Sequence, residues 1–322
     1  MKILVYNSGG GLGDSIQLFD LITSLSEKFG KKNIYYLTAH NDHFNNSLKD
    51  YNIVLKELKT DISYFGFRFW HLFKSKGKIL NNNLIDRFNL IIDLQSKFRN
   101  TIILKQFPSD NFYSPTFNFK FCNIKNDYLL TKYNAKNIIS NLEMMLKTKI
   151  LFRKYDINKI DKKFFDEAKR LLPDQNYVGF SITQGNKYRK KSWPLEKIIN
   201  VAKQILKKNK KPVFLIEKDN TELINDIKNK ISQALFPELK TTLSGPPLIT
   251  ALSTRLEKVV SIDNGIMHMI GLANIPMIVL FGPTNSKKFA PKIDQINILD
   301  SNIIYNTNDI SKITENDVLN LI

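Results

Sequence analysis

Residues 2–14, Lys2-Ile3-Leu4-Val5-Tyr6-Asn7-Ser8-Gly9-Gly10-Gly11-Leu12-Gly13-Asp14, decide the fold class of this chain. An apolar run passes into a glycine cluster and then into helical periodicity, which predicts a buried strand, a turn and the start of a helix. Apolar runs alternate with helical periodicity in the same way to the far end of the sequence. This alternation indicates an α/β protein, in which helices cover parallel sheets.

The expected elements form two series. The first series has strands at 2–7, 34–38 and 88–93 and helices near 14–29 and 135–149. The second has strands at 177–182, 212–216, 259–262 and 277–281 and helices near 162–172, 195–208, 220–233 and 247–256. A chain of 322 residues is also longer than one hydrophobic core usually serves. We therefore expect two facing Rossmann-like domains, residues 1–155 and 156–322, with a ligand cleft between them.

Composition excludes several classes of protein. The hydrophobic content of 43% and charged content of 24% are those of a globular protein rather than a disordered or disulfide-rich one. The single cysteine, Cys122, indicates a reducing compartment and is more typical of core filling than of a nucleophile. The sequence shows neither a signal peptide nor about 18 consecutive apolar residues, so we expect a soluble or peripheral protein.

The net charge of +18 indicates an anionic partner. Only seven of the 48 basic residues are Arg, whereas a nucleic-acid reader concentrates Arg for base and phosphate contacts. We therefore expect an anionic membrane or an acidic substrate and no nucleic acid. The stretch 64–78 interleaves aromatic and basic residues. It fits a membrane interface and, equally well, a helix that packs its aromatics inward.

The spacing of the glycines in residues 9–14 tests whether this turn binds a dinucleotide. A dinucleotide-binding turn has glycine at the sixth position from Gly9, where this chain has Asp14, and the end of the second strand, residues 36–40, lacks the acidic residue that would bind an adenosine ribose. Both departures weaken the interpretation as an NAD-dependent oxidoreductase. Asp14 itself fits either an N-terminal helix cap or a functional carboxylate.

Two later segments also place polar residues after strands. Residues 181–194 combine hydroxyls, a glycine and four cations in a loop that leads into a helix, which suits a diphosphate or a solvated loop. Residues 261–268 join a strand end, a glycine turn and a helix start. In the simplest interpretation, Asp263 caps that helix and His268 is a satisfied helix residue.

Together these segments resemble glycosyltransferase family 9, the lipopolysaccharide heptosyltransferases. The resemblance rests on five motifs in the family's order: Leu12-Gly13-Asp14, Asp93-Leu94-Gln95 with Arg99, Lys191-Ser192-Trp193-Pro194, Asp263-Asn264-Gly265 with His268, and Phe281-Gly282-Pro283-Thr284. The chain departs from the family at three places. It has Gln17 where the family often has His, and Asn264 where the family usually has Thr. Residues 217–219 replace a glycine-rich turn of the family.

The resemblance implies a GT-B fold and an inverting transfer from a nucleotide diphosphate sugar, ADP-heptose or a related one, to a lipopolysaccharide core or another glycan. It assigns catalysis to Asp14, as general base, and to Lys191, on the diphosphate. The implied donor-binding residues are Thr183, Lys187, Glu222 (or Glu217), Asp263, Gly265, Met267 and His268. The implied acceptor-binding residues are Gly11, Leu12, Gly13, Gln95, Lys97 and Arg99.

The remaining expectations concern cofactors, partners and location. The sequence contains no Asp-x-Asp pair, so we expect a metal-independent enzyme with no cofactor beyond the nucleotide sugar. Expected partners are an acidic glycolipid or glycan and an anionic membrane surface. We expect a cytoplasmic monomer, either free or peripheral on the inner face of the inner membrane. The alternatives are a non-catalytic nucleotide-sugar binding protein and, behind it, the oxidoreductase.

Overall fold

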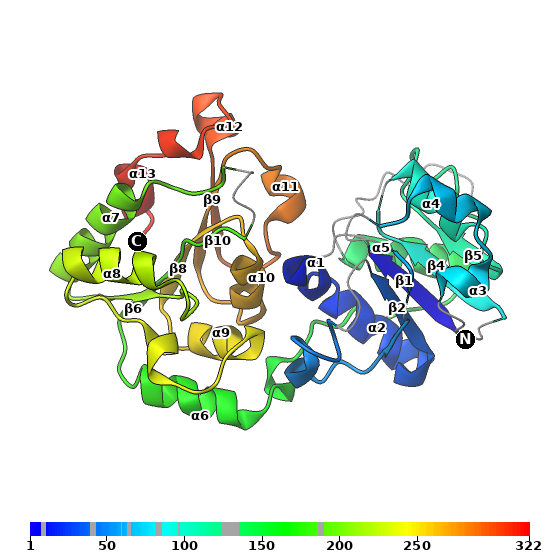
Figure 1. Cartoon of the computed structure of the whole chain (residues 1–322), viewed down its shortest axis with the longest axis horizontal. Helices are drawn as coiled ribbons and strands as arrows, with labels where there is room; N and C mark the ends of the chain where they lie inside the picture. The colour runs from blue at the N-terminus through cyan, green and yellow to red at the C-terminus, as the bar shows by residue number, and fades with distance from the viewer. Residues whose placement is uncertain are drawn as a thin grey trace. The chain divides into compact units, whose positions relative to one another are not determined.

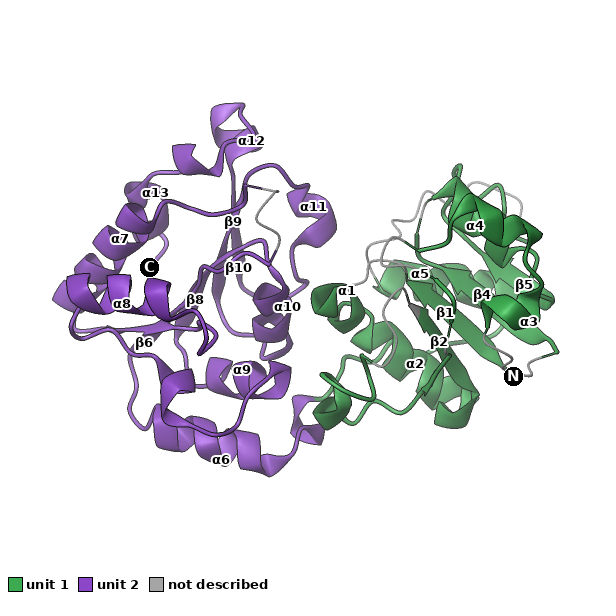
Figure 2. Cartoon of the chain, viewed as in Figure 1, with its two compact units in different colours: residues 1–156 green, residues 157–322 purple. Residues whose placement is uncertain are grey.

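The structure is a computed structural model of the whole chain (Figure 1). It describes residues 1–7, 11–38, 43–58, 60–62, 66–80, 86–95, 97–123, 135–185 and 190–322. The chain divides into two compact units, residues 1–156 and 157–322 (Figure 2). The expected boundary after residue 155 lies one residue before this division.

Unit 1 contains a five-stranded parallel sheet in the order β3-β2-β1-β4-β5. Its strands are β1 (Ile3–Asn7), β2 (Ile34–Thr38), β3 (Lys56–Glu57), β4 (Phe88–Asp93) and β5 (Ser109–Tyr113). Every residue of β1 is buried. A strand that is covered on both faces needs such a continuous run, because both alternating sets of side chains meet the core.

Helices cover both faces of this sheet. They are α1 (Leu12–Ile16), α2 (Phe19–Phe29), α3 (Lys76–Ile79), α4 (Phe98–Leu104) and α5 (Ala135–Leu146), with 3₁₀ turns η1 (Lys31–Asn33), η2 (Lys49–Tyr51) and η3 (Phe69–Phe73). The connections β1 to β2 and β4 to β5 run in opposite directions along the sheet, so right-handed crossovers place α2 and α4 on opposite faces. On the α4 face, Leu4 and Tyr6 pack in one core with Ile79 and Ile103.

The predicted extent of one helix is wrong. The helix expected near 14–29 is two helices, α1 and α2, separated by Gln17 and Leu18. At this point the Leu18 N–H bonds the carbonyl of Ser15, three residues back, and the helical pattern of bonds restarts with Ile22 bonding Leu18. The apolar residues on either side continue in phase across the break, so periodicity alone does not reveal it.

Unit 2 contains a second parallel sheet, in the order β10-β9-β8-β6-β7. Its strands are β6 (Tyr177–Ser181), β7 (Lys211–Phe214), β8 (Lys258–Ile262), β9 (Met277–Phe281) and β10 (Ile296–Asp300). Its helices are α6 (Lys162–Leu171), α7 (Leu195–Lys207), α8 (Thr221–Lys230), α9 (Pro246–Ser253), α10 (Gly265–Leu272), α11 (Ser286–Phe289), α12 (Ser301–Tyr305) and α13 (Glu315–Leu319), with 3₁₀ turns η4 (Ile157–Lys159), η6 (Pro237–Lys240) and η7 (Ile310–Lys312).

Both sheets contain a point where the strand order reverses. In unit 1 the chain runs outward from β1 to β2 and β3, and then returns to the other side of β1 with β4. In unit 2 it runs from β6 to β7 and returns to the other side of β6 with β8. Open α/β sheets bind ligands at the carboxyl ends of the strands that flank such a point. The loops after β1 and β4, and after β6 and β8, are therefore the first places to look for a site.

The helices have ordinary lengths for a globular protein. In the described part of the chain, no helix is both long enough and apolar enough to cross a membrane.

Candidate functional site

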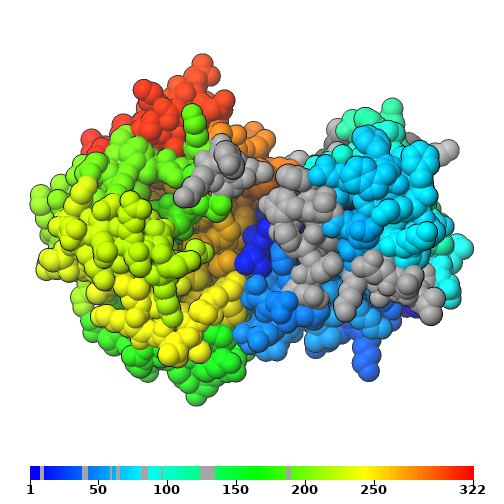
Figure 3. Space-filling view, in the orientation of Figure 1, coloured from blue at the N-terminus to red at the C-terminus, as the bar shows by residue number. Residues whose placement is uncertain are grey.

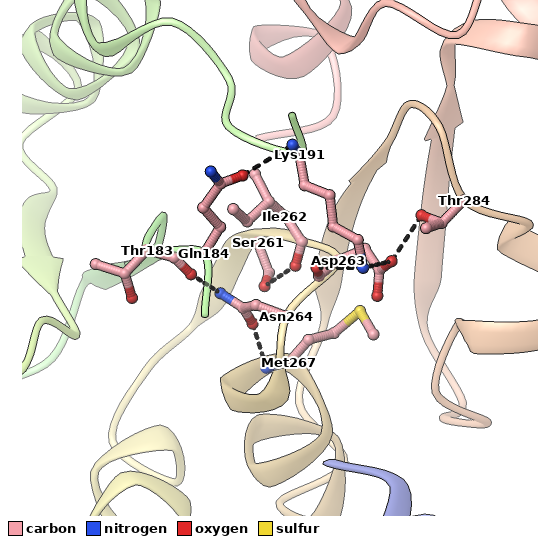
Figure 4. Close-up of polar contacts among 9 residues, drawn as sticks. All are labelled: Thr183, Gln184, Lys191, Ser261, Ile262, Asp263, Asn264, Met267 and Thr284. Atoms are coloured by element: carbon pink, nitrogen blue, oxygen red, sulfur yellow. Dashed lines mark hydrogen bonds and ion pairs between the residues drawn. The ribbon is translucent and has the colours of Figure 1, made fainter. Parts of the chain in front are cut away.

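A buried ion pair lies at the switch point of unit 2. The Nζ atom of Lys191, in the loop between β6 and α7, lies 2.5 Å from Oδ2 of Asp263, which follows β8 (Figure 4). Only 14% of the Lys191 side chain and 8% of the Asp263 side chain are exposed. Thr284, after β9, donates its hydroxyl to the same carboxylate oxygen at 2.6 Å. Charges this deeply buried persist only when they are paired and hydrogen-bonded, so each of these groups depends on the others.

The loop that carries Lys191 is held at two places. The backbone N–H of Lys191 donates to Oε1 of Gln184 at 2.8 Å. Two residues later, Trp193 is buried in the core, and its Nε1–H donates to the carbonyl of Ile313 at 3.0 Å. Pro194 then directly precedes α7. In the Lys-Ser-Trp-Pro motif, the tryptophan thus anchors the loop while the lysine reaches the site.

Asn264 caps the helix that follows Asp263. Its Oδ1 accepts from the N–H of Met267 at 2.8 Å, and its Nδ2 donates to the carbonyl of Thr183 at 2.9 Å. The interpretation of Asp263 as the cap is therefore wrong, because the cap lies one residue later and Asp263 pairs with Lys191 instead. The amide of Met267, which we expected to bind the diphosphate together with Gly265, is occupied by this cap. Gly265 is the first residue of α10.

Thr183 joins the site through its backbone. Its carbonyl is fixed by Asn264, and in Figure 4 its side chain lies on the opposite side of Asn264 from the Lys191–Asp263 pair. Hydrogen bonds from Asn264 to Thr183 and to Ser181 connect the ends of β6 and β8. The asparagine in place of the family's usual threonine therefore ties two strand ends together.

His268 lies in α10 and is buried. Burial lowers its pKa to about 4; the charge of Lys191 acts in the same direction and that of Asp263 opposes it. His268 is therefore neutral at pH 7 and contributes hydrogen-bonding capacity rather than charge.

One further donor-site residue, Glu222, is not joined to this group. Glu222 lies exposed in the first turn of α8, and no hydrogen bond or ion pair found among the described residues connects it to Lys191 or Asp263. Lys187 lies outside the described residues. The alternative carboxylate, Glu217, lies in the loop after β7 and is exposed.

The loop after β7 lies beside a buried carboxyl, Glu238 in η6. Burial raises the pKa of Glu238 to about 7; the charges of Glu217 and Asp219 add to the shift and that of Lys218 opposes it. The folded state therefore binds this proton more tightly than the unfolded state, so the contribution of Glu238 to stability falls as pH rises from about 4.5 to 7.

We expect Glu238→Gln, which mimics the protonated carboxyl, to raise the free energy of unfolding at pH 8 by an amount on the order of 2 kcal/mol. At pH 5 the same substitution should have little effect. Urea unfolding at both pH values measures this, with Glu222→Gln on exposed α8 as the matched control. An equal change at both pH values would contradict the buried titration.

In unit 1, the switch point brings Asp14 and Gln95 into one hydrogen-bonded chain. Asn7, at the end of β1, donates its Nδ2 to the backbone carbonyl of Asp14 at 3.1 Å. Gln95, after β4, donates its Nε2 to Oδ1 of Asn7 at 2.6 Å. Asn7 therefore fixes the start of α1 against the loop after β4. Asn7 is not among the residues predicted from the sequence; the one signal for it is its place as the last, polar residue of a buried strand.

Asp14 lies in the first turn of α1, with its side chain half-buried. The N-cap is Gly11, so the interpretation of Asp14 as the cap is wrong by three residues. A carboxylate in the first helical turn is stabilised by the helix dipole. A Cβ atom added at Gly11 would lie 3.4 Å from Oδ2 of Asp14, so glycine keeps the space beside the carboxylate open. Leu12 and Gly13 lie between them in α1, and Gly9 and Gly10 lie outside the described residues.

Asp93 is fully buried and organises the loop after β4. Its Oδ2 accepts from the hydroxyls of Thr101 at 2.6 Å and Ser114 at 2.8 Å, and its Oδ1 accepts from the N–H of Gln95 at 2.9 Å. This carboxylate is thus structural, because its hydrogen bonds fix the backbone that presents Gln95.

The two cations expected to bind the acceptor, Lys97 and Arg99, lie in different surroundings. Lys97 is exposed at the start of α4, and its backbone N–H donates to the Gln95 carbonyl at 2.7 Å. The guanidinium of Arg99 lies 5.5 Å from the ring centre of Phe69 in η3. Arg99 therefore belongs to the surface around η3 rather than to the Asp14 network.

The thiol of Cys122 is hydrogen-bonded to the backbone of Ser114. Its Sγ accepts from the N–H of Ser114 at 3.1 Å and donates to the carbonyl of the same residue at 3.2 Å. Burial raises its pKa to about 11. These hydrogen bonds and the raised pKa favour a structural role for Cys122 over a nucleophilic one, although the residue is half-buried rather than part of the core. No group of three or more His, Cys, Asp or Glu in the described part of the chain could hold a metal ion.

The chain matches one family of known proteins over most of its length. Residues 80–319 match the model of glycosyltransferase family 9 (heptosyltransferase). No protein of curated function matches the chain by sequence.

Solved structures match the chain over nearly its whole length. A glycosyltransferase of family 9 from Veillonella parvula is 16% identical with a TM-score of 0.66, and the match covers 99% of this chain and 95% of that one. The E. coli heptosyltransferase WaaC with ADP-2-deoxy-2-fluoro heptose is 14% identical with a TM-score of 0.66, covering 99% and 98%. E. coli ADP-heptose lps heptosyltransferase II is 16% identical with a TM-score of 0.62, covering 100% and 97%. The predicted α/β class and GT-B fold are confirmed.

Proposed function

The chain belongs to glycosyltransferase family 9, and we propose that this glycosyltransferase moves a heptose or related sugar from a nucleotide diphosphate sugar, ADP-heptose first among them, to a lipopolysaccharide core or another glycan. The buried Lys191–Asp263–Thr284 group at the switch point of unit 2 is the observation that carries this proposal. The ADP-heptose analogue named with the E. coli heptosyltransferase WaaC supports the choice of donor.

Lys191 is proposed to stabilise the leaving diphosphate. Breaking the bond from the sugar C1 to the phosphate oxygen leaves negative charge on the nucleotide, and a cation already in position lowers the free energy of that transition state. Asp263 and Thr284 hold the ammonium in place before the donor arrives, so little reorganisation is required. A diphosphate oxygen would then compete with Asp263 for Lys191.

Asp14 is proposed to take the acceptor proton. In an inverting transfer, the acceptor oxygen attacks C1 as the bond to the phosphate breaks, and the hydroxyl proton passes to the carboxylate. Asn7 and Gln95 hold the start of α1, which fixes the backbone that carries Asp14. Gln95 and Lys97 are proposed to bind the acceptor beside it.

The donor proposal is tested by thermal shift with a panel of ADP, UDP, CDP, GDP and NADH, followed by mass spectrometry of reactions with the matching nucleotide sugars. We expect ADP to stabilise the protein most and ADP-heptose to be consumed with release of ADP. Stabilisation by NADH alone would contradict the proposal and restore the oxidoreductase.

Activity is expected to survive chelation of divalent metals. The proposed charge stabilisation comes from Lys191, and the sequence has no Asp-x-Asp pair to hold a metal on a diphosphate. Turnover is measured after dialysis against EDTA, with a metal-dependent glycosyltransferase treated in parallel. Loss of activity with EDTA and recovery with Mg²⁺ would refute metal independence.

We further propose that the protein acts as a monomer in the cytoplasm, at the inner face of the membrane that holds a lipid-linked acceptor. An acidic glycolipid acceptor fits the net charge of +18.

A further inference from the structure

Among its described residues, unit 1 exposes five Phe and Trp side chains. Their exposed fractions are 59% for Phe69, 59% for Trp70, 90% for Phe73, 47% for Phe98 and 59% for Phe117. No other Phe or Trp within the described ranges is comparably exposed. Contiguous exposed apolar surface of this kind marks an interaction site. The expected alternative, in which the stretch 64–78 packs its aromatics inward, is wrong for Phe69, Trp70 and Phe73, whereas residues 64 and 65 lie outside the described residues.

The neighbours of these aromatics hold them outward. Phe67 is buried and stacks on Tyr6, with 5.3 Å between ring centres. His71 is also buried, and its Nε2 lies 2.6 Å from the carbonyl oxygen of Asp61. Because Phe67, before η3, and His71, in the middle of η3, are both anchored in the core, Phe69 and Trp70 between them and Phe73 after them project to solvent.

The exposed aromatics of η3 and α4 belong to one surface. Arg99 in α4 lies over the ring of Phe69, and Nε2 of Gln106 donates to the carbonyl of Leu72 at 3.4 Å. Phe98 in α4 packs on Phe117, with 5.5 Å between ring centres. Figure 3 shows the segments from η3 to α4, coloured sky blue to cyan, as continuous surface on unit 1.

The segments that form this surface contribute basic side chains and no acidic ones. The segments 66–80, 97–107 and 114–123 contain eight Lys and Arg residues and no Asp or Glu. The exposed cations are Lys76, Lys78, Lys97, Lys105 and Lys120. Lys74 is paired with Asp61, which lies outside these segments. Aromatic rings surrounded by exposed lysines are the chemistry that binds the headgroup region of an anionic bilayer.

We propose that this aromatic-basic surface, formed by Phe69, Trp70, Phe73, Phe98 and Phe117 with the five exposed lysines, binds an anionic lipid bilayer directly. Its rings enter the headgroup region while its lysines contact lipid phosphates. The inference rests on the proposed function only in assigning unit 1 to the acceptor: the surface then holds the acceptor-binding unit at the membrane that contains a lipid-linked acceptor.

The two tryptophans provide a direct probe. Trp70 is 59% exposed on the aromatic-basic surface, and Trp193 is 3% exposed in the core of unit 2. Vesicles of equal phosphatidylglycerol and phosphatidylcholine should shift the fluorescence of Trp70 to shorter wavelength, and vesicles of phosphatidylcholine alone should not. Trp70→Phe should abolish the shift and keep vesicle binding. An unchanged spectrum with bound anionic vesicles would overturn the proposal, because another surface would then be in contact.

Cosedimentation with the same vesicles tests the rings and the charges separately. The double substitution of Trp70 and Phe73 by Ser should weaken binding about tenfold or more, and the matched substitution of exposed Ile303 and Ile304 by Ser in α12 should not. Reversing Lys76 and Lys78 to Glu should weaken binding more than reversing Lys203 and Lys207 to Glu in α7, although the net charge changes equally. Equal losses within each matched pair would overturn the proposal.

Controls separate this inference from the proposed function. Circular dichroism melting checks the fold of each variant, and thermal shift with ADP reads the donor site, which should be unaffected. Vesicle binding without any ADP response would leave the aromatic-basic surface standing and refute the donor site. Self-association without vesicles that disappears in the Trp70 and Phe73 variant would show that a second copy of the chain occupies the surface, and would overturn the membrane proposal.

Discussion

Asp14→Asn is expected to lower turnover at least a hundredfold, the scale of general-base catalysis, while the fold and donor binding stay unchanged. The carboxylate lies in the first turn of α1, at the carboxyl end of β1, where the order of the sheet reverses. The hydroxyl of a sugar becomes acidic only as the new bond forms, so an ordinary carboxylate can accept its proton at that moment. An amide at the same place cannot.

The structure favours a stable Asp14→Asn variant. The contact that joins Asp14 to Asn7 uses the backbone carbonyl of Asp14, which the substitution preserves. The helix cap is Gly11, so the substitution does not change the cap residue of α1. Stability is checked by thermal melting, donor binding by calorimetry with ADP, and turnover by release of ADP.

Asp161→Asn is the matched control for this variant. Asp161 caps α6 in unit 2, where its side chain accepts from the N–H of Lys163, and asparagine caps about as well as aspartate. The control should keep full activity. A folded Asp14→Asn enzyme with full activity would show that the base is another residue.

The central strands of both sheets could be predicted from sequence, because buried parallel strands need continuous apolar runs. The strands β4 and β9 begin and end at the predicted residues. The strands β3, β5 and β10 are not predicted from the sequence. All three lie at sheet edges; β3 has only two residues, and β5, Ser-Asp-Asn-Phe-Tyr, has only its last two residues buried. An edge strand that is half exposed lacks the apolar run by which the others were found.

The candidate site was predicted where one motif contains both the strand end and the functional residue. Lys191 and Asp263 come from such motifs, and the structure pairs them. The sequence motif indicates only a turn at Thr284, because the contact of Thr284 with Asp263 depends on β9 lying beside β8. The wrong prediction that Asp263, rather than Asn264, caps α10 has a related cause. Both residue types cap helices well, so the sequence alone does not decide which of two neighbours does so.

Lys191→Ala is expected to weaken ADP binding by about 10- to 100-fold and to lower turnover at least as much, because a charge-assisted contact to phosphate is lost. The substitution has a second effect. It leaves the carboxylate of Asp263, whose side chain is 8% exposed, without its cation. Removing one partner of a buried pair costs about 3–5 kcal/mol when the pair is fully buried, so the single variant should also melt at a lower temperature.

A double variant separates these effects. In Lys191→Ala with Asp263→Asn, the buried charge is gone and Thr284 can still donate to the amide oxygen in place of the carboxylate. Thermal stability should return toward that of the wild type, because no unpaired charge remains buried. ADP affinity, measured by calorimetry, should stay low, because the phosphate has lost its cation. If the double variant instead regains both stability and ADP affinity, Lys191 serves only to neutralise Asp263, and the diphosphate is held by other groups.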